Sequence, residues 1–161
     1  MATTATNKQP LLVDRVFHNV IETNSLTSGS DTELNIVGTN ESAVLLDCST
    51  NDGGIIEDLY VISRSTTTPY TAVFYFSSAS DYLRPNEGVY IGKAESAATL
   101  GTVSYNADLP KVLAPLPSAG SDSQVRALYV PKGKVLWVSL QLANAANSTE
   151  TPIVGVQGGF Y

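Results

Sequence analysis

The sequence predicts an all-β protein, and an antiparallel β-sandwich with a jelly-roll-like topology is the architecture that we expect. Short runs alternate apolar and polar residues with a period of two, which is the pattern of half-buried strands. Clusters of Gly, Pro, Asn and Asp separate these runs. Helical periodicity is almost absent, since only residues 93–99 could form a helical turn or two. The 161 residues suit one domain, expected at 11–161 behind a flexible arm at 1–10.

The most regular strand is predicted at 134–142. Its even-numbered positions from Leu136 onward are apolar. Because neighbouring side chains of a strand point to opposite faces, we expect this set to face the core. Val135 and Trp137 then lie on the opposite face. A second strand at 124–130 precedes it, and Gly133 between the two supplies the positive φ of a tight turn, so we predict a β-hairpin.

The remaining strands follow from the same pattern. Residues 55–63 are apolar on both faces except for two acidic positions, which is typical of a central, well-covered strand. Aromatic and β-branched residues predict a strand at 70–77. Further strands are expected at 10–22, 33–38, 42–48, 88–93, 100–106 and 151–161. Nine or ten short strands without helices favour two packed sheets.

Two segments differ from these strands in composition. The N-terminal residues are small and polar and end at Pro10, and no apolar run follows Lys8, so we expect no secretory signal there. Residues 109–123 are rich in Pro and Ser, and Pro115 and Pro117 stiffen them. A loop of that length without secondary structure is uncommon unless it has a function.

Composition excludes several functional classes. Only 15% of the residues are charged, and 9 Lys and Arg in a chain of net charge −6 make a poor phosphate-binding surface, so we expect no nucleic-acid partner. The single cysteine, Cys48, excludes an internal disulfide and a multi-cysteine zinc site, and we expect it to be buried. No apolar run approaches the length of a membrane-spanning helix, so no membrane partner is expected either.

A search for catalytic groups finds no convincing set. His18 is the only imidazole, and a packed or surface position on the first strand is the favoured interpretation. Glu57 and Asp58 are the only adjacent carboxylates, but neighbours in a strand point to opposite faces. The oxygen donors at 49–53 could bind calcium, although an Asx-type turn explains them better. We therefore expect no enzymatic activity, no cofactor and no metal.

Aromatic side chains offer another kind of function. The chain has 8 Tyr, 4 Phe and 1 Trp, and most of them can fill a small sandwich. Some must face outward if their neighbours face inward. An outward Trp137 beside Val135 is the best candidate for a contact surface, because aromatic residues are enriched at interface hot spots. Such aromatics could instead stack on sugar rings.

The start MATTATNKQPLLVDR, the use of Ser and Thr in place of charge, the short strands and the segment LYVPKGKVLWVSL together resemble a known class. They are similar to small virion structural proteins of tailed bacteriophages, especially capsid decoration (cement) proteins of marine and cyanobacterial phages. The resemblance implies a homo-oligomer, typically a trimer, that is made in the host cytoplasm and placed on the outside of the head. It implies the major capsid protein as partner, and no enzymatic activity.

We expect contacts from the arm, the 109–123 loop and the outward face of the 134–142 strand. The candidate contact residues are Pro10, Leu11, Pro115, Pro117, Tyr129, Val135 and Trp137. Two alternatives remain open. One is a tail, neck or fibre module that binds carbohydrate or another virion protein. The other is a carboxylate hydrolase, which would need two acidic side chains at glycosidase spacing in a deep pocket.

Overall fold

The computed structural model describes residues 15–23, 42–66, 69–78, 89–104, 107–108, 112–113, 126–141 and 150–161. Within these ranges the chain forms strands and turns and no α-helix. The strands are β1 (Arg15–Glu22), β2 (Ser42–Asp47), β3 (Gly53–Ile62), β4 (Thr71–Ser77), β5 (Val89–Glu95), β6 (Val103–Ser104), β7 (Ala107–Asp108), β8 (Val112–Leu113), β9 (Arg126–Pro131), β10 (Val135–Gln141) and β11 (Ile153–Phe160).

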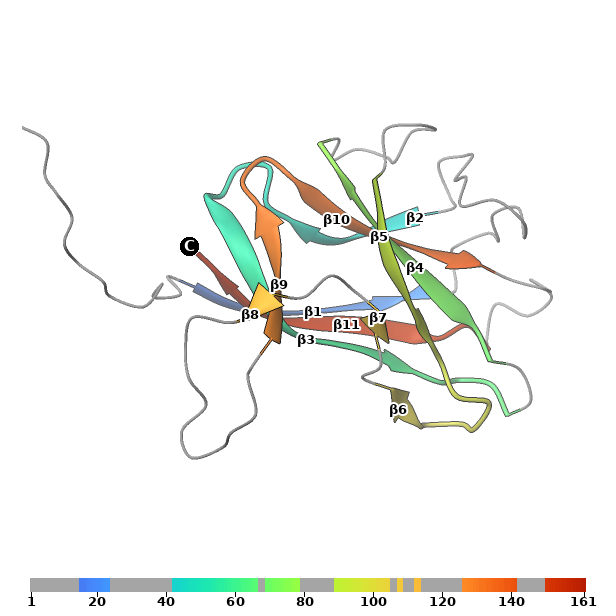
Figure 1. Cartoon of the computed structure of the whole chain (residues 1–161). Helices are drawn as coiled ribbons and strands as arrows, with labels where there is room; N and C mark the ends of the chain where they lie inside the picture. Colours follow the sequence, from blue (N-terminus) through green and yellow to red (C-terminus); the bar gives the residue numbers. More distant parts are fainter. Residues whose placement is uncertain are drawn as a thin grey trace, which may run out of the picture.

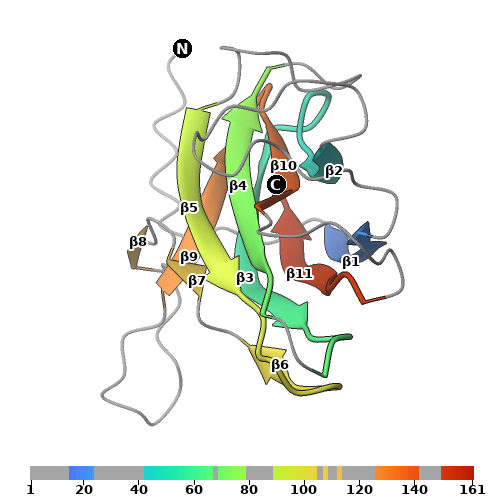
Figure 2. The same cartoon turned by 90° about the vertical axis from the view of Figure 1, so that its right-hand side faces the viewer.

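The strands form two sheets that face each other as two layers (Figures 1 and 2). The first sheet has the order β1-β11-β3-β9-β8, and β6 also pairs with β3. The second sheet has the order β2-β10-β4-β5-β7. All strand pairs are antiparallel. The predicted antiparallel β-sandwich is therefore confirmed.

The eight longer strands pair in a nested order. The first pairs with the last (β1 with β11), the second with the seventh (β2 with β10), the third with the sixth (β3 with β9) and the fourth with the fifth (β4 with β5). Along the chain, β1 and β3 belong to the first sheet and β2 and β4 to the second, so successive strands alternate between the sheets. Segments that are far apart in the sequence thus lie side by side, as β1 and β11 do in Figure 1.

The main core lies between the sheets and follows the alternation along each strand. In β10, Leu136, Val138 and Leu140 all point into it, as predicted. Phe74 of β4 and Leu59 of β3 contact the same cluster from the two sheets. Each such side chain contributes about 1.5–3 kcal/mol when it leaves water. This shared apolar layer holds the two sheets together.

The predicted hairpin between 124–130 and 134–142 is wrong. The turn exists, with Gly133 at φ 74° and the Lys134 N–H donating to the Pro131 carbonyl at 3.1 Å. However, β9 pairs with β3 and β8, whereas β10 pairs with β2 and β4. The turn crosses from one sheet to the other, where Gly133 N–H donates to the carbonyl of Cys48 at 3.0 Å. Turn chemistry predicts a change of direction, but it does not predict which strands then pair.

Several other boundaries differ from the expectations. The first strand begins at Arg15 among the described residues, and the expected strand at 33–38 lies outside them. Residues 93–99, which could have formed a helical turn or two, do not: residues 93–95 continue β5 and residues 98–101 form bends and turns. Of the expected strand at 100–106, residues 103–104 form β6, residues 100–102 do not belong to a strand, and residues 105–106 lie outside the described residues. The predicted arm at 1–10 lies outside the described residues.

Candidate interaction face

The predicted contact surface around Trp137 is buried. Trp137 does lie on the side of β10 opposite the main core, as alternation predicted, but it is only 2% exposed and Val135 is 0% exposed. Both belong to a second apolar cluster with Val73 and Tyr75, against which Val44 packs. Tyr75 and Val44 are the direct neighbours of Trp137 across the two adjacent strands. We call these five residues the covered face; their burial overturns the expectation that Val135 and Trp137 are exposed for contact.

Polar groups on the covered face are buried with the apolar ones. Ser139 is 5% exposed and hydrogen bonds to the side chain of Tyr75. Burial raises the pKa of Tyr75, and the Ser139 hydrogen bond only partly offsets this effect. The phenol therefore stays protonated at neutral pH, and its ring contributes to packing.

Of the other predicted contact residues, Tyr129 can be placed. It lies on the outward side of β9, half-buried, while Leu128 and Val130 on either side of it point into the main core. Its ring stacks on that of Tyr161, with centroids 6.5 Å apart and planes 25° apart. Pro10, Leu11, Pro115 and Pro117 lie outside the described residues.

The outer face of the first sheet is exposed to solvent along β1, whereas on the outer face of the second sheet Tyr90 of β5, beside Tyr75, is exposed. On β1, Val16 is 80% exposed and Val20 is 52% exposed, with exposed His18 between them. The intervening residues Phe17 and Ile21 turn inward and pack against the main core. We call this outer surface of β1, β11 and β3 the open face. Apolar residues therefore occupy both sides of β1, and those on the outer side are left exposed.

Tyr60 of β3 lies across the middle of the open face. It sits opposite Gly155 of β11, and its hydroxyl reaches over that strand to within 2.6 Å of His18 Nε2 on β1. The Tyr60 and His18 rings are 5.9 Å apart and inclined by 63°. A Cβ added to Gly155 would come within 2.1 Å of the Tyr60 ring. The missing side chain at 155 thus allows the aromatic ring to lie along the sheet.

Next to Tyr60, an irregularity in the pairing shapes the open face. The register between β11 and β3 shifts between Gln157 and Gly158, which leaves one extra residue, Glu57, in β3. A Cβ on Gly158 would lie 1.9 Å from the backbone oxygen of Ile55, so the bulge requires glycine there. Gln157 beside it donates from Nε2 to Asp58 Oδ2 at 2.5 Å. Ile56 before Glu57 and Leu59 after Asp58 both belong to the main core, so the bulge leaves the two carboxylates on the outward side together. The expectation that the two carboxylates point to opposite faces is therefore wrong, and Asp58 is bound to the Gln157 amide.

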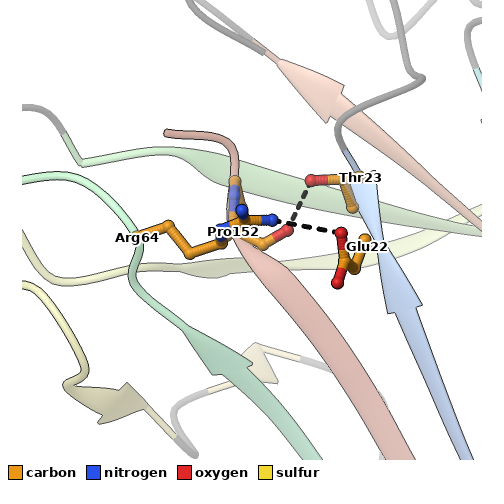
Figure 3. A network of polar contacts seen from close by, with 4 residues as sticks. All are labelled: Glu22, Thr23, Arg64 and Pro152. Carbon is orange, nitrogen blue, oxygen red and sulfur yellow. Dashed lines mark hydrogen bonds and ion pairs between the residues drawn. The ribbon is translucent and has the colours of Figure 1, made fainter. Parts of the chain in front are cut away.

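Contacts at one end fix β1 to the body of the sheet. Figure 3 shows the Arg64 guanidinium beside Glu22 and the Thr23 hydroxyl beside the Pro152 carbonyl. Arg64 Nη1 lies 3.3 Å from Glu22 Oε2, and Thr23 Oγ1 donates to the Pro152 carbonyl at 2.5 Å. The ion pair is solvent-exposed and so contributes little stability. The Thr23 bond is buried, which makes it the stronger constraint on where β1 ends.

The groups considered for catalysis and metal binding occupy structural roles. In the turn after β2, Asp47 Oδ1 accepts the Ser49 N–H at 2.7 Å, so the Asx-type bond comes from Asp47, before the 49–53 segment for which it was expected, and Asp52 pairs with Lys132 at 2.5 Å. Burial, assisted by the nearby carboxylate of Asp47, raises the pKa of Cys48 to about 11, so the thiol stays protonated at neutral pH. Within the described ranges, no three His, Cys, Asp or Glu side chains are grouped so that they could hold a metal ion.

Among the described residues, there is no helix with the length and hydropathy needed to cross a membrane. Comparison with protein-family models, with curated proteins and with solved structures finds no match to this chain. The open face is therefore the candidate functional site on the geometry alone. It combines exposed aliphatic side chains with an aromatic ring and hydrogen-bonding groups, which is chemistry suited to contact with another molecule.

Sequence reasoning missed the open face, although a signal for it exists. Val16, His18 and Val20 alternate with Phe17 and Ile21 in RVFHNVIE, so both sides of this strand carry apolar residues. Either side could have been taken as the core side. Tyr60 gave no comparable signal, because the glycine that accommodates it lies about a hundred residues further along the chain.

Proposed function

We propose that this chain is a virion structural protein, namely a capsid decoration (cement) protein of a tailed bacteriophage. It binds the outer surface of the head, bridges neighbouring major capsid proteins and associates with copies of itself. The observation that carries the proposal is the open face, where exposed apolar side chains lie on a two-sheet scaffold. The resemblance in the sequence supports the class of partner. We also propose a jelly-roll topology, a fold common in capsid proteins, which the nested strand pairing supports.

The open face suits docking on a large, rigid partner for two reasons. Its Val16 and Val20 side chains expose apolar surface to water. Removing such surface from water is the main favourable contribution to the free energy of association. Its polar groups are already held by hydrogen bonds within the sheet, between His18 and Tyr60 and between Gln157 and Asp58. A preorganised face loses little side-chain entropy on binding. Many copies on a shell would add these weak contacts into avidity.

Mixing the chain with undecorated phage shells tests this proposal directly. Binding at defined lattice positions is expected by electron microscopy. The double variant Val16→Ser with Val20→Ser should lower occupancy about tenfold or more at limiting concentration, because two buried methyl-bearing side chains are lost from the contact. The matched control is Val89→Ser with Leu100→Ser, which removes two exposed apolar side chains elsewhere. Two results would exclude the open face as the docking site. One is that the parent chain does not bind the shells, and the other is that the Val16/Val20 variant and the Val89/Leu100 control bind them equally.

Deletion of residues 1–9 tests the arm separately. If the arm contributes to docking, the shortened chain should occupy fewer lattice positions while keeping its far-ultraviolet circular dichroism. Unchanged occupancy would limit the contact to the sandwich.

Tyr60 favours a second candidate function, a carbohydrate-binding module of a tail, neck or fibre. Its ring lies along the sheet beside Gln157, Asp58 and His18, and aromatic rings flanked by hydrogen-bonding side chains are a common way to bind sugars. Titration calorimetry with a panel of glycans would detect this. A sugar that binds the parent chain and loses at least tenfold affinity in Tyr60→Ala would favour the second function over the first.

A further inference from the structure

Two acidic side chains share the outward side of the open face because of the bulge in β3. In a regular strand, Glu57 and Asp58 would point to opposite faces, and one of them would enter the core. The extra residue at the bulge changes this, so that Ile56 and Leu59 on either side of the pair both reach the main core. The fold thus presents two adjacent carboxylates on the surface of a sheet.

This arrangement has a structural cost. The bulge interrupts the pairing of β3 with β11, and it requires glycine at 158, where a Cβ would collide with the backbone of Ile55. Two like charges side by side also repel each other. Bulges commonly re-aim a side chain near a functional surface. A stable sheet needs neither the bulge nor two adjacent charges, which points to a role in binding.

No cation among the described residues compensates the two charges. The ion pairs of the described part of the chain involve other carboxylates, and neither Glu57 nor Asp58 takes part in one. Glu57 is exposed, and Asp58 accepts a hydrogen bond from the neutral amide of Gln157. An amide donor satisfies an oxygen lone pair but leaves the negative charge in place. The middle of the open face therefore carries charge that a positively charged partner would neutralise.

We propose that the partner of the open face is a basic segment of a protein, in which an arginine or lysine side chain binds Glu57 and Asp58 while its apolar neighbours cover Val16 and Val20. This assignment rests on the open face being the contact site proposed above, but not on the partner being a capsid. Charge complementarity selects the occupant. A second copy of this chain is less suitable at this face, because its net charge is −6.

The layout of the face suits one partner segment. His18, Gln157 and Asp58 lie side by side across β1, β11 and β3. Val16 and Val20 flank His18 on β1. Two strand spacings, about 10 Å, separate β1 from β3, which one extended segment or one helix can span. The aliphatic part of an arginine or lysine side chain can cover apolar surface while its charged end reaches the carboxylates.

Two labelled peptides test the charge preference of the chain. The first, of about ten residues, alternates arginine with leucine, and the second has glutamate in place of every arginine. Fluorescence anisotropy should show that the full chain binds the arginine peptide at least tenfold more tightly. Raising the salt concentration from about 0.05 M to about 0.5 M should remove most of that preference, because contacts between exposed charges are screened.

A neutral variant of the pair shows whether these two carboxylates carry the preference. Glu57→Gln with Asp58→Asn removes both charges and keeps an oxygen acceptor for Gln157, so it should bind the arginine peptide about tenfold more weakly. The matched control is Asp52→Asn with Glu95→Gln, which changes the net charge equally at two other exposed carboxylates. The control should bind like the parent chain. Thermal unfolding checks that both variants are folded.

Reversing the charges provides the decisive measurement. Glu57→Lys with Asp58→Lys should bind the glutamate peptide more tightly than the arginine peptide. A loss of folding could not produce this gain. A basic partner is excluded if the parent chain binds the two peptides equally or binds neither. It is also excluded if the neutral variant and its control lose the same affinity, or if the charge reversal leaves the preference unchanged.

Shell binding by the same variants separates the basic partner from the capsid proposal. If shells bind the neutral variant as well as they bind the parent, while the Val16/Val20 variant loses occupancy, the open face docks through apolar contacts and the basic partner is excluded. If no shell binds the parent but the arginine peptide does, with the expected loss in the neutral variant, the capsid proposal fails and the basic partner is supported.

Discussion

Both sheets of this sandwich turn one face away from the main core, and the two outer faces are built in different ways. The covered face of the second sheet holds Trp137, Tyr75 and three valines in a tight cluster. The open face of the first sheet leaves Val16 and Val20 exposed and spreads Tyr60 over a glycine. The same alternation of residues thus produces a second core on one side and an accessible surface on the other.

This difference shows what strand periodicity can and cannot determine. Alternation assigns each residue to one side of its sheet, and the structure agrees with that assignment for β10. Exposure depends in addition on what packs against that side, which is a property of the whole chain. On the covered face, an indole and a phenol ring lie opposite each other on paired strands, and aromatic side chains of this size gain most by leaving water.

The largest expected effect is on the covered face. Trp137→Ala should lower the free energy of unfolding by about 3–5 kcal/mol, because it empties a buried site that cannot collapse fully. Denaturation by urea, followed by circular dichroism, measures this change. Tyr60→Ala on the open face is the comparison and should cost clearly less, since its ring is half-buried. A cost below about 1 kcal/mol for Trp137→Ala would show that the covered face is exposed in solution.

Substitutions of Gly155 and Gly158, two of the three glycines of β11, should rank next in their effect on the free energy of unfolding. Gly158→Ala should cost about 3 kcal/mol, because its new methyl group meets the backbone of Ile55, which cannot move without breaking the bulge. Gly155→Ala should cost less, since its methyl group meets the end of the Tyr60 side chain, which can rotate away. Combining Gly155→Ala with Tyr60→Ala should remove most of the added cost. Equal costs for the two glycine variants would contradict the distinction between backbone and side-chain contact.

Alkaline pH should act on the covered face through Tyr75. Burial raises the pKa of this phenol above 10, the ordinary value that it regains on unfolding. The folded state therefore holds the proton more tightly, and the resulting stability is present below about pH 10 and is lost as the pH rises through the folded pKa. Tyr75→Phe should flatten that decline in a series of urea denaturations from pH 8 to 11. A decline of the same slope in both proteins would assign it to other groups.

Much of the fold could be predicted from local patterns. The strands β3, β4, β10 and β11 were predicted within a few residues, because alternation and β-branched residues report on local burial. The pairing of β9 and β10 was not, because the Gly133 turn gives no information about the partners on either side. The nested order brings together strands such as β1 and β11, whose contact is set by the packing of the entire chain.

The candidate site was harder to predict than the fold. Trp137 was assigned to the correct side of its strand and to the wrong environment. The open face depends on a glycine at 155 and a tyrosine at 60 that meet only after folding. Neither residue has a distinctive neighbour in the sequence, so only the register of β3 and β11 reveals their contact.

The smallest expected effect is on the open face itself. Val16→Ser should change the free energy of unfolding by less than about 0.5 kcal/mol, because an 80% exposed side chain leaves little contact to lose. Urea denaturation of Val16→Ser is compared with that of Val135→Ser, which places a hydroxyl in the buried cluster. The same chemical change is thereby measured on both faces. If Val16→Ser destabilises the chain as much as Val135→Ser does, then β1 is covered in solution. A stable Val16→Ser protein that has lost binding would instead show that this valine is kept exposed for contact, since an exposed aliphatic side chain does little else for the fold.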